Sequence, residues 1–562
     1  MLTRTSFISA ALLAVAAAAP SHLPLSLRQR QVSNASESEW DYIVAGAGPA
    51  GIIVAERLAE KGSKVLLLER GGPSTQSSGG TFNATWDADG LTVYDIPSQS
   101  PAIFETGAIS ACDDTAGLAG CLLGGGVEVN ALVFVEPPNH DFDDNWPEGW
   151  KYSDVENAAN SLYSRNPPTT TPSTDGLPYD TREFQLLGSF LNSTLGYSQI
   201  DAVKDRNSKE KVYSRPSFNI QNGERGGPVR SYLPLAQNLT NFSLQMHSSV
   251  IRVVRDGNTI TGVEVNNTET NTRSIISVCS GGRVVLAAGS MRTPAILINS
   301  GIGPTDQIET VANSSSTLNI TLPEKSDWIS LPVGTQIKDH PIVTVNFDVP
   351  SSENLTLYDY NDPLESDKTS YLSKRTGVLA QGYQRLLFWN SFVGSDNKTR
   401  YIQGTTSASA NNTIQIKFYL THGLTSIGQL GMTSSGATTL LKAPYFTSTA
   451  DSDGLATFID SFISSVQNST SWTQSSSTNG TGAELIKSYV AGDHYVGTAK
   501  MGKDSGLEGG ESVVDCDTKV YGTENLFVVD ASIHPDLPTG NTQAIVMVVA
   551  ERAAEKILAL GA

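Results

Sequence analysis

The sequence predicts an α/β fold with a parallel sheet, interrupted by an α+β part that is built on an antiparallel sheet. Three observations lead to this prediction. A strand–helix–strand pattern with a glycine-rich turn begins near Asp41, and two later strand-like runs lead into similar turns of small residues. The long segments between these runs include stretches that alternate polar and apolar residues, as half-buried antiparallel strands do. At 562 residues the chain is long enough for two domains.

The strands of the parallel sheet come from distant parts of the chain. Residues 41–45 form a short apolar strand, residues 49–61 carry apolar side chains at helical spacing, and residues 64–69 form a second apolar strand. Similar strands are predicted at residues 283–288 and 525–529, each before a turn rich in Gly, Ala or Ser. The first domain is therefore assembled from separate pieces.

The first strand–helix turn, residues 46–51, reads Gly-Ala-Gly-Pro-Ala-Gly. Gly46 permits the tight turn, Gly48 lets the backbone approach a pyrophosphate, and Gly51 lets helix and strand pack closely. Glu69, at the end of the next strand, is placed to accept hydrogen bonds from ribose hydroxyls. The pattern predicts a Rossmann-like dinucleotide site, and the helix N-terminus supplies N–H groups for the phosphates. It does not separate NAD from FAD.

The antiparallel part is predicted from residues such as 413–420, where polar and apolar side chains alternate. We expect it to form a substrate domain, with residues 464–481 as a surface loop. The predicted division assigns residues 40–149, 236–329 and 491–562 to the nucleotide domain, and residues 150–235 and 330–490 to the substrate domain.

The N-terminus indicates secretion. Arg4 precedes an apolar run at residues 7–19, which predicts a signal peptide at residues 1–19 and a flexible leader at residues 20–39. The run is shorter than the about 20 residues that a membrane span needs, so we expect a soluble extracellular protein. Sequons for N-glycosylation recur along the chain, among them Asn34, Asn83, Asn192, Asn238, Asn241, Asn313, Asn319, Asn354, Asn397, Asn468 and Asn479.

The formal net charge of −19 argues against nucleic acid or an anionic membrane as a partner, because both repel an acidic surface. Small molecules remain as substrates.

The four cysteines predict one or two disulfides in an oxidising compartment. Cys112 and Cys121 are close enough in sequence for a local loop, and Cys279 and Cys516 would form the other pair. No Cys or His spacing suits a metal site, so we expect no metal.

Four blocks of sequence together resemble the glucose-methanol-choline (GMC) family of flavin oxidoreductases. They are residues 46–51, 120–131, 289–304 and 525–543. The resemblance runs from Asp41 to the C-terminus. It implies FAD as cofactor in a fold of GMC type, with an external electron acceptor that is a quinone, oxygen or a redox protein. It also implies flavin or nucleotide contacts at Asn130, Val250, Asp530, Ala531 and Thr542.

The resemblance further implies the catalytic pair. His494 matches the family's general base and Asn541 its partner. Oxidation of an alcohol by hydride transfer needs the hydroxyl proton removed, and an imidazole with a pKa near 6.5 suits this task. Asn541 would hold the substrate oxygen as a neutral donor. The other histidines are expected to lie in the leader, on the surface or in structural positions: His22, His140, His247, His340, His422 and His534.

Within the family, residues 65–75 and 119–126 are most similar to the flavin domain of cellobiose dehydrogenases, and the short leader leaves no room for their haem domain. Three departures make cellobiose doubtful. Residues 109–111 replace a tryptophan pair, Ala131 replaces a Gly, and Asp493 replaces an Asn, where it would bond sugar hydroxyls or favour a protonated His494. We therefore expect oxidation of a sugar or related alcohol. The alternatives are an aryl or secondary-metabolite alcohol oxidase or dehydrogenase, and a hydroxynitrile lyase.

Overall fold

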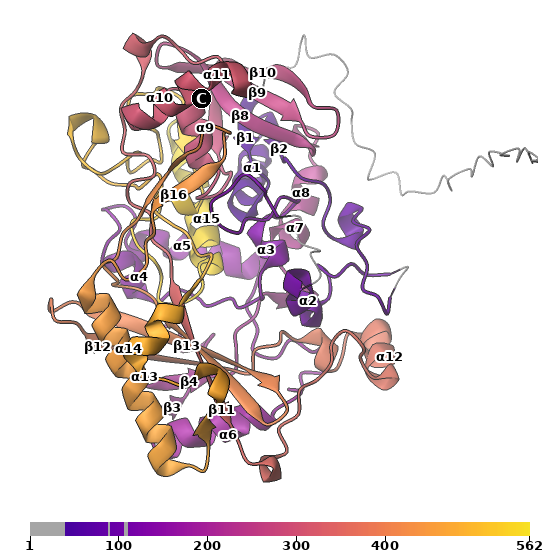
Figure 1. Ribbon diagram of the computed structural model, residues 1–562. Coiled ribbons are helices and arrows are strands. Elements are labelled where there is room, and N and C mark those ends of the chain that lie inside the picture. The colour runs from indigo at the N-terminus through magenta and orange to yellow at the C-terminus, as the bar shows by residue number, and fades with distance from the viewer. Residues whose placement is uncertain (1–39, 88–89, 106–110, 562) are drawn as a thin grey trace, which may run out of the picture.

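A computed structural model describes residues 40–87, 90–105 and 111–561. The predicted signal peptide and leader lie outside these residues, as do Ile109 and Ser110. Figure 1 shows one sheet with its helices in the upper half of the molecule and a second sheet with its helices in the lower half. The predicted combination of a parallel and an antiparallel sheet is confirmed.

The first sheet has the order β7-β2-β1-β10-β9-β8, and β19 also pairs with β10. Strands β7, β2, β1, β10 and β19 run parallel, whereas β8, β9 and the first part of β10 form an antiparallel meander. The turns after the parallel strands therefore meet at one edge of the sheet. The strands are β1 (Trp40–Ala45), β2 (Val65–Leu68), β7 (Phe242–Gln245), β8 (Ser248–Asp256), β9 (Thr259–Asn267), β10 (Thr272–Leu286) and β19 (Leu526–Val528).

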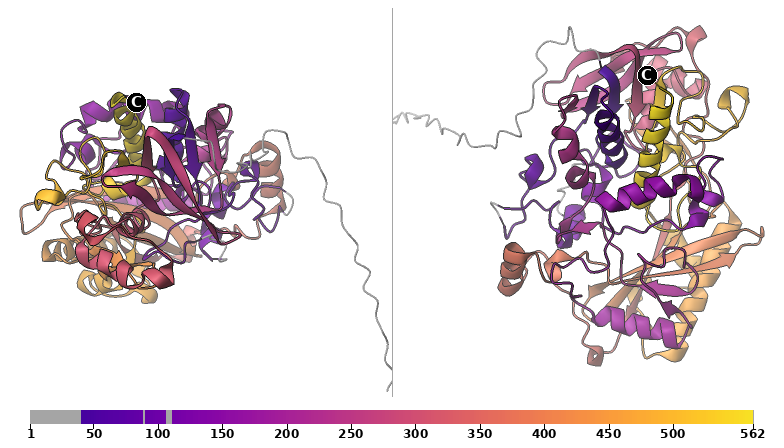
Figure 2. Two further views of the ribbon diagram at one scale, coloured as in Figure 1. Left: turned by 90° about the horizontal axis from the view of Figure 1, so that it is seen from above. Right: turned by 180° about the vertical axis from the view of Figure 1, so that it is seen from behind.

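Helix α1 (Pro49–Glu60) begins with a proline, whose missing N–H would have no partner in the first turn. It packs against α15 (Gln543–Ala559), which packs in turn against α5 (Tyr152–Arg165), as the rear view shows (Figure 2). Helices α7 (Pro228–Ser231) and α8 (Leu233–Gln237) also contact α1. Residues 150–235 are thus divided between the two halves, because this range also supplies elements of the second sheet.

The second sheet has the order β17-β11-β14-β13-β12-β4-β3, with β18 paired to β11. Its side chains alternate between two faces. Ile414, Ile416 and Phe418 of β14 lie in the core with α6 (Arg182–Ser193) and α13 (Thr449–Ser469), whereas the intervening residues face the other way. The strands are β3 (Ser198–Gln199), β4 (Val212–Ser214), β11 (Pro341–Asp348), β12 (Leu386–Val393), β13 (Thr399–Ala410), β14 (Thr413–Leu420), β17 (Thr473–Gln474) and β18 (Val490–Ala491).

The strand predicted at residues 413–420 matches β14, but the predicted loop at residues 464–481 is wrong in its first part. Helix α13 continues to Ser469 because Ile463 and Val466 are buried against the sheet. The helix is rich in Ser, which concealed the helical period. The other elements are α2 (Ser100–Glu105), α3 (Gly126–Val129), α4 (Asn139–Asp143), α9 (Thr293–Asn299), α10 (Thr305–Asn313), α11 (Ser315–Leu318), α12 (Glu365–Lys374), α14 (Gly482–Leu485), β5 (Ile220–Gln221), β6 (Glu224–Arg225), β15 (Gln429–Met432) and β16 (Thr438–Lys442).

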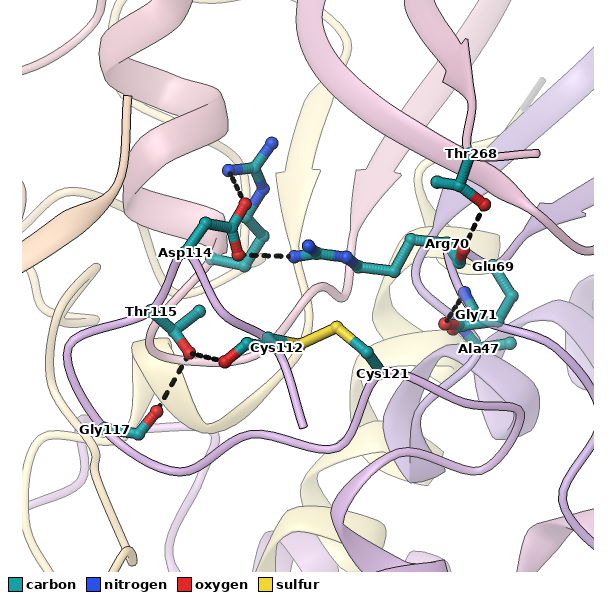
Figure 3. The surroundings of a disulfide bond; sticks show 11 residues. Ala47, Glu69, Arg70, Gly71, Cys112, Asp114, Thr115, Gly117, Cys121 and Thr268 are labelled. Atoms are coloured by element: carbon teal, nitrogen blue, oxygen red, sulfur yellow. Dashed lines mark hydrogen bonds and ion pairs between the residues drawn. A yellow bond between two sulfur atoms is a disulfide. The ribbon is translucent and has the colours of Figure 1, made fainter. Parts of the chain in front are cut away.

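The predicted disulfide between Cys112 and Cys121 is present, with the Cα atoms 5.2 Å apart (Figure 3). The predicted pair of Cys279 and Cys516 is wrong. The Cys279 thiol lies 3.4 Å from Asp41 Oδ1 at the start of β1. Cys516 lies elsewhere, in the loop that precedes β19, where its backbone carbonyl accepts a hydrogen bond from Trp150 Nε1. The even number of cysteines does not reveal that Cys279 and Cys516 lie in different parts of the fold.

Among the helices in the described ranges, none is both long enough and apolar enough to cross a membrane.

Candidate active site

A cavity of about 1010 Å³ lies between the two sheets. One wall is formed by the carboxyl ends of β1, β2 and β10, and the other by the face of the second sheet that carries Gln415, Lys417 and Tyr419. This volume is at the upper end of the range of about 300 to 1,000 Å³ that ligand pockets occupy. Every predicted site residue except Gly51 lines it: Gly46, Gly48, Glu69, Asn130, Val250, His494, Asp530, Ala531, Asn541 and Thr542.

The glycine turn is shaped by contacts that exclude side chains. Gly46 has φ +108°, and a Cβ atom there would lie 2.5 Å from the Ala287 carbonyl oxygen. A Cβ atom at Gly51 would lie only 1.9 Å from the Gly46 carbonyl oxygen. Gly48 is different, because the nearest atom to its Cβ would be 4.0 Å away, which leaves the space above it open to the cavity. The absence of a side chain at Gly51 therefore allows the helix to pack closely against the turn. The absence of a side chain at Gly48 leaves room for a ligand to approach the backbone.

The Glu69 carboxylate fixes the turns on either side of it. It accepts hydrogen bonds from the Ala47 amide at 2.9 Å and the Gly71 amide at 2.8 Å. Burial raises its pKa although these amides oppose the shift. Each carboxylate oxygen still has a lone pair for a hydroxyl of a bound molecule, because one amide uses only part of its acceptor capacity.

The Asp530 carboxylate joins the ends of β10 and β19. It accepts from the Gly289 amide at 2.9 Å, the Thr293 hydroxyl at 2.6 Å and the Ser532 amide at 2.8 Å. Ala531 follows it, and Thr542 directly precedes α15 at the cavity wall. Asp530 thus shapes two wall turns by hydrogen bonds to both.

Asn130 lies at the end of α3. Its Oδ1 accepts from the Leu132 amide at 2.9 Å and from Arg225 Nη1 at 3.0 Å, while its Nδ2 donates to Gln543 Oε1 at 2.9 Å. Arg225 is fully buried, and nothing in the sequence singled it out. Val250 contributes to the wall from β8.

The orientation of His494 follows from a chain of hydrogen bonds. Gln403 Nε2 donates to Asn541 Oδ1 at 2.9 Å, so the amide nitrogen of Asn541 faces His494 Nε2 at 3.3 Å. An amide nitrogen can only donate, so His494 Nε2 is an acceptor without a proton. The proton of His494 is then on Nδ1, which lies 3.0 Å from His340 Nδ1. This tautomer leaves His494 Nε2 as the basic atom.

Burial lowers the pKa of His494 to about 4. It also lowers the pKa of His340 well below its usual range, and the neighbouring His494 adds to this shift. Both rings are therefore neutral at neutral pH. The sequence-based expectation that Asp493 would favour a protonated His494 is not met, since the Asp493 carboxylate accepts from the Leu118 amide at 3.2 Å and burial raises its own pKa.

Asp339 holds the backbone around His494. Its carboxylate accepts from the amides of His494 and His340, both at 2.8 Å, and from the hydroxyl of Tyr445 at 2.6 Å. Burial raises its pKa to about 7 despite these donors. Asp339 thus fixes the two histidine backbones relative to each other.

Comparison with known proteins identifies the family. A family model described as GMC oxidoreductase matches residues 41–342, more than half of the chain, and a second model with the same description matches residues 425–550. The chain belongs to the GMC oxidoreductase family.

Two curated relatives are similar over most of their length. The dehydrogenase eriK of Hericium erinaceus is 25% identical, over 92% of this chain and 94% of the relative. The glucose dehydrogenase (FAD, quinone) of Drosophila melanogaster is 26% identical, over 92% and 86%. A crystal structure of formate oxidase superposes with a TM-score of 0.73 at 18% identity, covering 93% of this chain and 99% of the oxidase.

FAD is the cofactor of this GMC oxidoreductase, and the cavity fits such a group. Gly48 leaves open space at the N-terminus of α1, where a phosphate is favoured. Buried polar atoms without a partner in the described residues, Ser290 Oγ and Gln543 Nε2, belong to residues that line the same cavity. Such atoms are expected to bond a polar ligand.

Two residues that contact the predicted pair, Gln403 and His340, were not predicted from the sequence to do so. Gln403 lies in the middle of β13 and reaches Asn541 only through the tertiary fold. His340, expected to be structural, is positioned against His494 by the pairing of Pro341 in β11 with Ala491 in β18. The sequence carries no local signal for either contact.

Proposed function

We propose that this GMC oxidoreductase is a secreted enzyme that oxidises a CH–OH group of a sugar or related alcohol, with His494 as the general base. The observation that carries the proposal is the unprotonated Nε2 of His494, which faces the cavity beside Asn541. FAD supplies the hydride acceptor when it is bound. The roles of the protein's own residues follow from their contacts.

In this proposal, the substrate hydroxyl replaces Asn541 Nδ2 at the single lone pair of His494 Nε2 and donates its proton there. Asn541 Nδ2 then donates a hydrogen bond to the substrate oxygen and holds it next to the imidazole. His340 Nδ1 accepts a hydrogen bond from the Nδ1–H of His494 and keeps that ring in one tautomer. A base placed in this way contributes about 100- to 10,000-fold to the rate. Gly46, Gly48, Glu69, Asn130, Val250, Asp530, Ala531 and Thr542 would hold the cofactor.

The substrate panel follows from the sequence and from the cavity wall. Motifs similar to cellobiose dehydrogenase place sugars first. The second candidate is an aryl alcohol, favoured by the aromatic side chains Tyr358, Tyr360, Tyr383 and Tyr419 in the wall. Quinone, oxygen and a redox protein are the candidate electron acceptors.

Anaerobic reduction of the holoenzyme tests the proposal. Sugars and aryl alcohols should bleach the flavin absorbance, and the best of them defines the substrate. A hydroxynitrile lyase would bind its substrate without bleaching. Loss of the flavin reduction in His494→Ala, with FAD still bound, would assign the base.

Secretion is part of the same proposal, and it is supported by the exposure of most sequon asparagines, Asn192, Asn397 and Asn468 among them. Asn241 is different, because its Nδ2 donates to the carbonyls of Ala59 and Ser63. Peptide mapping of protein secreted by a yeast host should find glycans at exposed sequons and none at Asn241. Retention of the chain inside the cell with an intact N-terminus would contradict secretion.

A further inference from the structure

The face of the second sheet that borders the cavity carries a cation. On β14 the residues alternate between the buried core and this face, which presents Gln415, Lys417 and Tyr419. Lys417 pairs across the sheet with Thr405 on β13 and Thr344 on β11, so its immediate neighbours are uncharged.

The position of Lys417 relates it to the catalytic pair. The Tyr419 ring stacks on the His494 ring with the centroids 6.2 Å apart. Lys417 precedes Tyr419 by two residues on the same strand face, which is about 7 Å along the strand. Its charge reaches Tyr419: burial raises the pKa of that phenol, and Lys417 opposes the shift.

Lys417 also differs from the other cations of the wall. Arg385 pairs with Asp180 at 2.8 Å. Arg70 and Arg292 both pair with Asp114, at 3.0 and 3.1 Å. The ammonium group of Lys417 has no ion pair or side-chain hydrogen bond with any residue that the structure describes, although the side chain is half-buried.

The carboxylates that line the cavity are likewise engaged elsewhere. Glu69 and Asp530 bond the turns of the nucleotide wall. Asp493 bonds Leu118, and Asp359 accepts from the amides of Asn361 and Asp362. Lys417 is thus a partly desolvated charge without a counter-ion in the described chain, and such a charge gains most from an anion that enters with the ligand.

We propose that Lys417 binds a carboxylate of the substrate, so that the preferred substrate is an alcohol that carries an anionic group. This inference rests on the proposed function, since the same cavity receives the alcohol. His494 meets the carbinol and Lys417 the carboxylate, about one strand repeat apart. Uronic acids and hydroxymethyl benzoates have this combination of groups.

The first experiment measures binding without turnover. Benzoate and benzamide, which carry no carbinol, are titrated into the oxidised holoenzyme, and the flavin absorbance reports occupancy. Lys417→Met should weaken benzoate binding by about 10- to 100-fold, the range for loss of a charge-assisted hydrogen bond. Benzamide binding should not change, and Lys417→Arg should restore most of the affinity for benzoate. Lys442→Met, which removes an exposed lysine outside the cavity, is the matched control.

The second experiment compares flavin reduction by 4-(hydroxymethyl)benzoate with 4-(hydroxymethyl)benzamide, and by glucuronate with glucose. Lys417→Met should raise KM for the acids and leave the reduction rate at saturation and the FAD content unchanged. Equal losses for acid and amide, unchanged benzoate binding, or loss of FAD in Lys417→Met would overturn the inference. If no alcohol reduces the flavin but benzoate still depends on Lys417, the proposed function fails and the anion site stands.

Discussion

The two walls of the cavity are built in different ways. Around the glycine turn the nucleotide wall is shaped by backbone, with the tight turn at Gly46 and the open space over Gly48, and the Glu69 carboxylate holds the Ala47 amide beside it. The substrate wall presents side chains from a paired strand, such as Gln415 and Lys417. A side chain added at the glycine turn is therefore expected to disturb the first wall, whatever its chemistry. The second is sensitive to the functional group at each position, and the predictions below test this difference.

The largest expected effect is on the nucleotide wall. Gly51→Ala places a Cβ atom against the Gly46 carbonyl and should lower the free energy of unfolding by about 3 kcal/mol or more, because the backbone must shift. Gly48→Val should instead give a folded protein without FAD, because the space it fills belongs to the cofactor. Thermal denaturation and flavin absorbance separate these outcomes. Normal FAD content in Gly48→Val would show that the pyrophosphate passes elsewhere.

The next effect is at the base. His494→Ala should reduce its flavin about 100- to 10,000-fold more slowly and retain FAD, since the side chain accepts a proton and bonds no nucleotide-binding turn. Asn541→Ala should lose less, because it removes a donor and leaves the base. Stopped-flow reduction measures both. A wild-type rate of flavin reduction in His494→Ala would contradict the proposed mechanism.

A smaller effect is expected from Gln403→Leu. This change removes the donor that orients Asn541, with a net value of about 0.5 to 1.5 kcal/mol, or about two- to tenfold in the reduction rate. The loss should vanish in an Asn541→Ala background, where there is no amide to orient. Gln415→Leu, on the same sheet face but outside this chain of hydrogen bonds, is the control. Equal losses in both glutamine variants would indicate a general change of the wall.

The smallest effect is in the pH profile. Because burial lowers the pKa of His494 to about 4, the imidazole stays neutral and able to accept a proton at all higher pH values. The reduction rate should therefore be nearly constant from about pH 5.5 to 8 and fall as pH drops through about 4. An inflection near 6.5, the unperturbed value, would show that substrate or water relieves the burial.

The walls also differ in how far the sequence predicts them. The glycine turn and Glu69 of the nucleotide wall come from one continuous unit, and residues 41–69 predict its strands and its helix. His494 and Asn541 were predicted through the family resemblance, and the structure brings their side chains to 3.3 Å from each other. Gln403, His340 and Lys417 were not found, because their contacts depend on strand register between β11, β13 and β14. Side-chain alternation predicts a strand but not its neighbour. The prediction of a second disulfide was wrong for a similar reason, because the local sequence does not show which distant cysteines lie close together in space.

The ring closed by Cys112 and Cys121 extends across both walls. Within it, Asp114 holds Arg70 and Arg292 at the nucleotide end, as Figure 3 shows for Arg70. Its other side bonds Asp493, the residue before His494, through the Leu118 amide. The covalent ring therefore links the segment around Arg70 and Arg292 to the segment that precedes His494. A chain that folds in a reducing compartment would have to align these two ends by weak contacts alone, so correct assembly of the site is linked to an oxidising environment, such as the one that the proposed secretion would provide.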